Sequence, residues 1–108
     1  MKLEAKVKLW FENENGYVFG EGAFRLLSKI QEVGTLSNAA KELGMSYRHA
    51  WGTIKRMESR IGKPLLKTHK GGATPGGSEL TPEALLLMKK YLEVKKNLKE
   101  TDVTVEFL

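Results

Sequence analysis

Residues 36–61 read LSNAAKELGMSYRHAWGTIKRMESRI. This stretch predicts two helices joined by a tight turn, over about residues 37–43 and 46–61, and each helix has a serine at its N-cap, Ser37 and Ser46. The small pair Ala39-Ala40 allows the helices to cross closely, and Gly44 can adopt the left-handed backbone that the turn requires. The pattern is that of a helix-turn-helix over residues 37–61, in which the second helix lies in the major groove of DNA.

The second helix has one apolar face and one polar face. Its apolar residues recur at intervals of four, three and four, which predicts packing on the core: Ala50, Ile54, Met57 and Ile61. The opposite face is expected to meet DNA, and its first turns carry Ser46, Tyr47, Arg48, His49, Gly52 and Thr53. Lys55, Arg56 and Arg60 lie further along the helix and are candidate phosphate contacts.

The residues near the start of this helix have different expected roles. For Arg48 a bidentate bond to guanine is favoured over a phosphate contact, and for Tyr47 a phosphate bond is favoured over a thymine methyl. His49 fits an exposed helix position as well as a base contact. A glycine inside a helix costs about 1 kcal/mol relative to alanine, so Gly52 suggests close approach of DNA or of another helix. Trp51 adjoins the apolar face and is expected to pack.

A glycine-rich hairpin is predicted over residues 65–81. Two short strands, 65–69 and 79–81, flank the tip of the hairpin. The tip contains four glycines and one proline and therefore cannot be helical. Such a hairpin is the wing of a winged helix, where cations and exposed backbone amides approach phosphates. The candidate contacts are Lys67, His69, Lys70, Gly71 and Gly72.

The positive charge of the chain is concentrated in the same region. The 108 residues carry a formal charge of +5, and residues 36–77 hold eight cations against two anions. A cluster of this kind is typical of a surface that displaces counterions from nucleic-acid phosphates. A solvated lysine-rich face would give the same count, so charge alone leaves both interpretations open.

The two ends of the chain show strand patterns. Strict alternation over residues 3–11 predicts one half-buried strand, and Asn15-Gly16 predicts the turn of a β-hairpin that occupies residues 1–20. Alternation recurs over residues 103–107 and predicts a short edge strand that pairs with this hairpin.

Two further helices are predicted. The first covers residues 21–33 and ends at Gly34; the last covers residues 82–100 and begins at Thr81-Pro82. The last helix has an apolar seam with spacings of three and four: Ala84, Leu87, Tyr91, Val94 and Leu98. A second stripe lies beside the seam: Leu85, Met88 and Leu92. We expect the seam to form the interface of a homodimer; the alternative is one wide stripe on a single core.

The composition excludes several classes of function. The absence of cysteine rules out a disulfide framework, a thiolate zinc site and an iron–sulfur cluster. The histidines, His49 and His69, both fall in the basic region, and no acids are spaced for acid–base catalysis, so neither an enzyme nor a metal or cofactor site is expected. No apolar run approaches the roughly 18 residues of a membrane span. A cytoplasmic, nucleoid-associated protein without membrane contact is therefore expected.

A longer set of motifs points to a known family. The set comprises Gly34-Thr35-Leu36-Ser37-x-Ala39-Ala40-x-x-Leu43-Gly44-Met45-Ser46-Tyr47-Arg48-x-Ala50-Trp51, then Ile54-Lys55, and the glycines at 72–77 before Leu80-Thr81. It resembles the N-terminal DNA-binding domain of the ModE-type molybdate-responsive regulators, which belong to the LysR-type winged helix-turn-helix group. The resemblance spans about residues 9–98. It implies a recognition helix over 46–61, a wing over about 65–80 and a final helix that helps to form a symmetric dimer.

The resemblance also carries an expectation about ligands. Regulators of this type sense molybdate or tungstate through C-terminal oxyanion-binding domains, and this chain ends before such a domain could begin. We therefore expect no oxyanion ligand in this chain.

These observations predict one α+β, mainly α, domain over residues 1–108: a winged helix-turn-helix with an N-terminal hairpin, a glycine-rich wing and a long C-terminal dimerisation helix. The expected function is transcription control by a homodimer that binds specific sequences of double-stranded DNA. The rival interpretation is a winged-helix module that binds an acidic protein or holds DNA without sequence preference. The ratio of specific to nonspecific affinity distinguishes the two.

Overall fold

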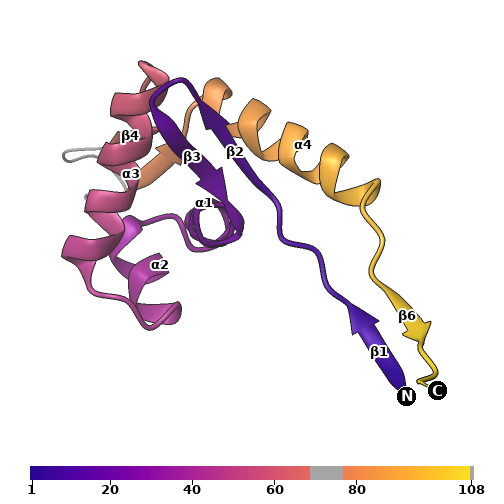
Figure 1. Cartoon of the computed structure of the whole chain (residues 1–108). Coiled ribbons are helices and arrows are strands. Elements are labelled where there is room, and N and C mark those ends of the chain that lie inside the picture. Colours follow the sequence, from indigo (N-terminus) through magenta and orange to yellow (C-terminus); the bar gives the residue numbers. More distant parts are fainter. Residues whose placement is uncertain (69–76, 108) are drawn as a thin grey trace.

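The computed structural model describes residues 1–68 and 77–107 (Figure 1). The helices are α1 (Glu21–Val33), α2 (Leu36–Glu42), α3 (Tyr47–Ile61) and α4 (Pro82–Lys96). The strands are β1 (Lys2–Ala5), β2 (Trp10–Asn13), β3 (Gly16–Gly20), β4 (Leu66–Thr68), β5 (Ser78–Leu80) and β6 (Thr101–Thr104). Within the described residues the strands form three antiparallel pairs, β1–β6, β2–β3 and β4–β5. The fold is mixed α+β and mainly helical, consistent with a winged helix-turn-helix.

The hydrophobic core is built around α1, which packs against the other three helices and against β3. Its largest fully buried side chains come from five elements or their ends: Phe19, Leu26, Leu27, Ile30, Ile54, Leu65 and Tyr91. Three phenylalanine rings surround Tyr91, with centroids 5.2 to 5.6 Å from the tyrosine ring. Burial of this aromatic group joins β2, β3 and α1 to α4 and fixes the helices against one another.

The helix-turn-helix has the predicted order, with one change at the start of α2. Ser37 is exposed and inside the helix, because the N-cap is Thr35, whose Oγ1 accepts a hydrogen bond from the Asn38 amide at 3.0 Å. The shift follows from packing, since it brings Leu36 into the helix and into the core. The predicted turn is confirmed: Gly44 has a φ of 69°.

The N-terminal strand is divided, and the prediction of one strand over residues 3–11 is wrong. β2 and β3 form the predicted hairpin across Gly16, but β1 leaves it and pairs with β6 at the other end of the chain. The predicted strand over 103–107 is likewise displaced to Thr101–Thr104. Figure 1 shows the β1–β6 ribbon projecting away from the helices, with both chain ends at its tip. Alternation is the same in both pairings, so the sequence could not distinguish them.

The last helix is shorter than predicted, and its apolar seam is mainly core. α4 ends at Lys96 rather than near residue 100. Ala84 and Tyr91 are 0% and 1% exposed within one chain, so neither side chain can contact a second copy. Ala84, Met88 and Tyr91 are buried in the core, at intervals of four and three residues. Leu87 is partly buried against the core. Val94 and Leu98 remain 40% exposed.

Candidate DNA-binding surface

The start of α3 is fixed by a side-chain cap. Ser46 Oγ accepts a hydrogen bond from the His49 amide at 3.0 Å, as the sequence predicted. The cap leaves Tyr47, Arg48 and His49 exposed in the first helical turn. Because the N-terminal residues of such a helix reach base edges, this turn is the part of the chain best placed for contact with DNA.

The buried and exposed faces of α3 follow the predicted period. Ala50, Ile54 and Met57 are buried against the core. A helical repeat of 3.6 residues puts Arg48 and Gly52 on the opposite face. A Cβ built on Gly52 would meet no atom within 4 Å, so no neighbouring element of the described chain requires a glycine there. No helix among the described residues therefore explains Gly52, and close approach of DNA or of a helix from another molecule stays a prediction.

Trp51 is on the surface, and the prediction that it packs is wrong. Its side chain is 48% exposed, and Lys55 Nζ lies 5.5 Å from the ring centroid. With Tyr47 and Leu66 it lines a groove of about 530 Å³ between α3 and the wing strands. Position 51 is one residue from the core position 50, a rotation of about 100° that turns the ring to the wing side of α3. This rotation away from the core face could have been read from the sequence as a sign that Trp51 is exposed.

The cations on α3 have different surroundings. Lys55 forms an ion pair with Glu58 at 3.2 Å, and the Arg60 guanidinium donates a hydrogen bond to the Tyr17 carbonyl. Arg48 and Arg56 form no ion pair or side-chain hydrogen bond with any described residue. Thr53 is less available than predicted, because its hydroxyl donates to the His49 carbonyl at 3.0 Å. Arg48 and Arg56 are thus the α3 guanidiniums free to bind an anion.

The base of the wing is attached to the helices by several hydrogen bonds. Glu58 Oε2 accepts from the Leu65 amide at 2.7 Å, which ties β4 to α3. The Ser78 amide donates to the Gly34 carbonyl at 2.7 Å, which ties β5 to the end of α1. Thr81 then caps α4 and donates through Oγ1 to the Pro64 carbonyl at 2.8 Å. These bonds hold Lys67, which is exposed on β4, beside the recognition helix.

Part of the predicted wing surface lies outside the described residues. His69, Lys70, Gly71 and Gly72 belong to residues 69–76, which the structure does not describe. Of the predicted contacts, α3 brings together Tyr47, Arg48, His49, Gly52, Thr53, Lys55 and Arg56, and β4 adds Lys67.

Comparison of the sequence with known families identifies the group. Residues 22–85 match the family described as "Bacterial regulatory helix-turn-helix protein, lysR family", which covers more than half of the chain. The chain belongs to this family. The match runs from the start of α1 into α4 and so includes the helix-turn-helix and the wing of this lysR-family chain.

Several known proteins are similar to this lysR-family domain. It is 39% identical over 67 residues to "Transcriptional regulator ModE" of Haemophilus influenzae, covering 62% of this chain and 26% of that protein. It is 34% identical over 76 residues to "Molybdenum-pterin-binding protein MopB" of Rhodobacter capsulatus, covering 70% and 28%. It is 35% identical over 89 residues to "DNA-binding transcriptional dual regulator ModE" of Escherichia coli K12, covering 82% and 34%. The chain spans about a third or less of these proteins.

These matches agree with the expected LysR-type, ModE-like character of the domain, a DNA-binding module of transcriptional regulators. No helix among residues 1–68 and 77–107 is long and apolar enough to cross a membrane. The same part of the chain brings no three His, Asp or Glu side chains together as a metal site. Among the described residues of the lysR-family domain, α3 presents exposed Tyr47, Arg48 and Trp51, and β4 adds exposed Lys67.

Proposed function

We propose that this chain is a sequence-specific, double-stranded DNA-binding transcriptional regulator that acts as a homodimer. The observation that supports this most strongly is the exposed face of α3, where Arg48 has no partner among the described residues and Gly52 leaves the backbone uncovered. An unpaired guanidinium at the start of a recognition helix can bind O6 and N7 of guanine at the same time. A helix surface without a Cβ at its centre can approach the base edges closely.

The neighbouring residues are proposed to hold the helix on the DNA backbone. Lys55, Arg56 and Lys67 are exposed, and each can neutralise a phosphate on one side of the groove. Tyr47 is proposed to donate to a phosphate from the wing side of α3, and His49 to face DNA from the opposite side of the helix. Ser46 and Thr53 already use their side chains within the helix, so we assign them to positioning α3. From the sequence alone, we also propose that His69, Lys70, Gly71 and Gly72 contact DNA.

The proposed dimer uses one of the two apolar sides of α4 that the core leaves partly exposed. Val94 and Leu98 are each 40% exposed, Leu87 lies at its edge, and Leu98 shares a hollow with Val7, which is 44% exposed. Exposed apolar side chains that gather on one side of a helix often mark a contact with another protein. Two copies paired about a twofold axis would cover this side of α4 and would fix the separation of the two recognition helices on successive turns of DNA.

The dimer interface is tested by sedimentation equilibrium with two matched double variants. Val94→Asp with Leu98→Asp is expected to give a folded monomer. Leu85→Asp with Leu92→Asp, at positions 43% and 42% exposed on the other side of α4, is the control and should remain dimeric. A monomeric wild-type chain at tens of micromolar, or dissociation of the control pair alone, would contradict the proposed interface.

The DNA preference is tested by selection of bound fragments from a pool of random duplexes. We expect enrichment of a roughly palindromic sequence with half-sites about one helical turn apart. Recovery of fragments with no shared sequence would favour nonspecific DNA binding, and no recovery above background would favour binding to an acidic protein.

A further inference from the structure

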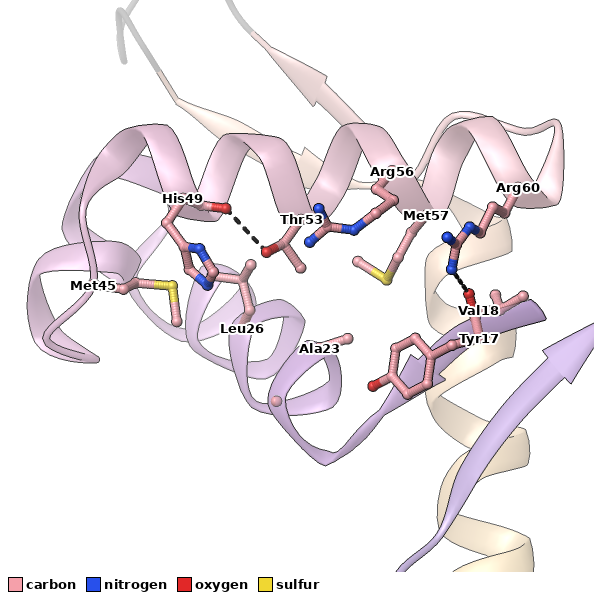
Figure 2. Close-up of a pocket in the computed structure, with 11 residues that line it drawn as sticks. Tyr17, Val18, Ala23, Leu26, Met45, His49, Thr53, Arg56, Met57 and Arg60 are labelled. Atoms are coloured by element: carbon pink, nitrogen blue, oxygen red, sulfur yellow. Dashed lines mark hydrogen bonds between the residues drawn. The ribbon is translucent and has the colours of Figure 1, made fainter. Parts of the chain in front are cut away.

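The exposed surface of α3 has two unlike sides. On the side toward α1 and β3 the helix carries polar groups, those of His49, Thr53 and Arg56 (Figure 2). On the side toward the wing strands it carries two aromatic rings, those of Tyr47 and Trp51. These two residues are 55% and 48% exposed, so both rings are accessible from solvent. The wing side of α3 therefore offers DNA an apolar surface that the other side lacks.

Trp51 is the ring closer to the middle of the surface that is proposed to face DNA. A helix turns about 100° per residue, so Trp51 lies about 60° around the axis from Arg48, whereas Tyr47 lies about 100° from it. The next residue, Gly52, adds no side chain, and a Cβ built there would meet no described atom within 4 Å. The indole can thus reach the same DNA groove as the Arg48 guanidinium.

The Trp51 ring is also held in place by its neighbours on α3. Tyr47 and Lys55 lie one turn before and one turn after it, and side chains four residues apart on a helix are in contact range. Lys55 Nζ lies 5.5 Å from the ring centroid and is itself anchored by an ion pair with Glu58 at 3.2 Å. A ring held in this way loses less conformational freedom when it binds a partner.

The chemistry of the major groove limits what an indole can contact there. The base edges present hydrogen-bond donors and acceptors, and their one apolar group is the C5-methyl of thymine. An indole placed on a donor or acceptor would remove its water without replacing the hydrogen bond, which is unfavourable. An indole placed on the methyl group covers one apolar surface with another, which is favourable.

We propose that Trp51 is a specificity-determining residue that contacts the C5-methyl group of a thymine, in the same half-site as the guanine bound by Arg48. This inference rests on the proposed function, because it requires α3 to lie in the major groove of a specific sequence. It assigns the two chemistries of the surface to two bases, with the guanidinium on guanine and the indole on thymine.

The test compares a duplex selected from random sequences with a copy that carries deoxyuridine at every thymidine position. Uracil keeps the base pairing and the phosphate charges and lacks only the methyl group. Burial of one such group contributes about fourfold in affinity, so the wild-type chain should bind the thymine duplex at least about fourfold more tightly. Trp51→Ala should bind both duplexes equally, and Trp51→Phe, which keeps an apolar ring, should retain a preference of at least about twofold. Circular dichroism should show both variants folded, because Trp51 is half-exposed.

Tyr47→Ala is the matched control, because it removes an exposed ring from the same side of α3 one turn earlier. It should weaken binding of both duplexes alike and keep the preference for thymine. Loss of the preference in Tyr47→Ala with its retention in Trp51→Ala would refute the assignment to Trp51. The same preference in Trp51→Ala as in the wild type would also refute it.

The outcome for the wild-type chain separates this inference from the proposed function. Equal affinity for the thymine and uracil duplexes would overturn thymine recognition and leave sequence-specific DNA binding intact. Selection that recovers no shared sequence would contradict the proposed function, and thymine recognition with it.

Discussion

Replacement of Glu58 by alanine should destabilise the fold by about 2–3 kcal/mol and weaken DNA binding, because this carboxylate holds the wing on α3. Its Oε2 accepts hydrogen bonds from the Leu65 amide at 2.7 Å and the Leu66 amide at 3.4 Å. Its Oε1 pairs with Lys55 at 3.2 Å, and the Glu58 side chain is only 14% exposed. Solvent therefore has little access to the groups that the substitution would leave unpaired.

Most of the loss is expected from the Leu65 amide. Leu65 is completely buried, and a buried N–H group without an acceptor costs about 1–3 kcal/mol. The longer bond to Leu66 adds less. The ion pair to Lys55 is half-exposed on the lysine side and contributes about 0.3–0.5 kcal/mol. Glu58→Gln keeps an oxygen acceptor and should cost about 1 kcal/mol, and Lys55→Gln should cost less than about 0.5 kcal/mol.

Urea unfolding followed by circular dichroism measures the free energy of unfolding of each variant. In thermal unfolding, the melting temperature of the Glu58→Ala variant should fall by about 10 °C or more, at 4–8 °C per kcal/mol for a domain of this size. The same variant should bind a selected duplex more weakly, since Lys67 is carried on the strand that it releases. If Glu58→Ala were as stable as Lys55→Gln, the wing would be held by other contacts and the reasoning would fail.

Three other outcomes follow from the described contacts. Arg48→Ala should cost about 1–3 kcal/mol on a selected duplex and relax base preference at one position per half-site, whereas Lys67→Ala should weaken all duplexes alike; equal losses on selected and random DNA would assign Arg48 to a phosphate. Burial, and then the hydrogen bond to Glu21, raises the pKa of Tyr91 to about 12. The folded chain thus holds this proton more tightly than the unfolded chain. In urea titrations the free energy of unfolding should therefore be highest below about pH 10 and decline toward pH 12. The Tyr91→Phe variant should not show this decline. Calorimetry should detect no micromolar binding of molybdate, because the α3 guanidiniums without a described partner, Arg48 and Arg56, are exposed to solvent and do not replace the water of a doubly charged oxyanion.

The parts of the fold that the sequence predicted well depend on local interactions. The left-handed Gly34 that ends α1, the serine cap of α3 and the Thr81 cap of α4 each involve residues within one helical turn. The hairpin across Asn15-Gly16 is local in the same sense. For these features the identity of one or two residues determines the backbone. The cap of α2 is equally local but was misplaced, because burial of Leu36 moves the helix start to Thr35.

The parts that differed depend on residues far apart in the chain. The sequence predicted that the C-terminal strand pairs with the N-terminal residues 1–20, and β6 does pair with β1, which joins residue 2 to residue 104. The alternation did not show that β1 leaves the hairpin or which residues pair. On α4, spacings of three and four showed that two apolar stripes exist but not which one the core would take. The phenylalanine cluster around Tyr91 decides that, and its members lie on three other elements.

The rotation of position 51 away from the core face could have been read from the sequence, but the position of Trp51 beside the wing required the structure. Its neighbour Ala50 is on the core face, and a rotation of one residue puts the indole at the junction of α3 and β4. The core assignment of Ile54 and Met57 was correct because their period is strict. The predicted pattern of α3 was thus correct for its buried residues. The prediction was incomplete at the edge of α3 beside the wing, where it missed Trp51.

The most direct test of the account is the affinity of the wild-type chain for a selected palindromic duplex and for a scrambled duplex of equal length, measured across a range of salt. We expect the selected duplex to bind at least about a thousandfold more tightly at physiological salt, and the affinity for both duplexes to fall linearly on log–log axes as salt rises. Equal affinity for the two duplexes would contradict base recognition by α3, and an affinity independent of salt would contradict the phosphate contacts assigned to Lys55, Arg56 and Lys67.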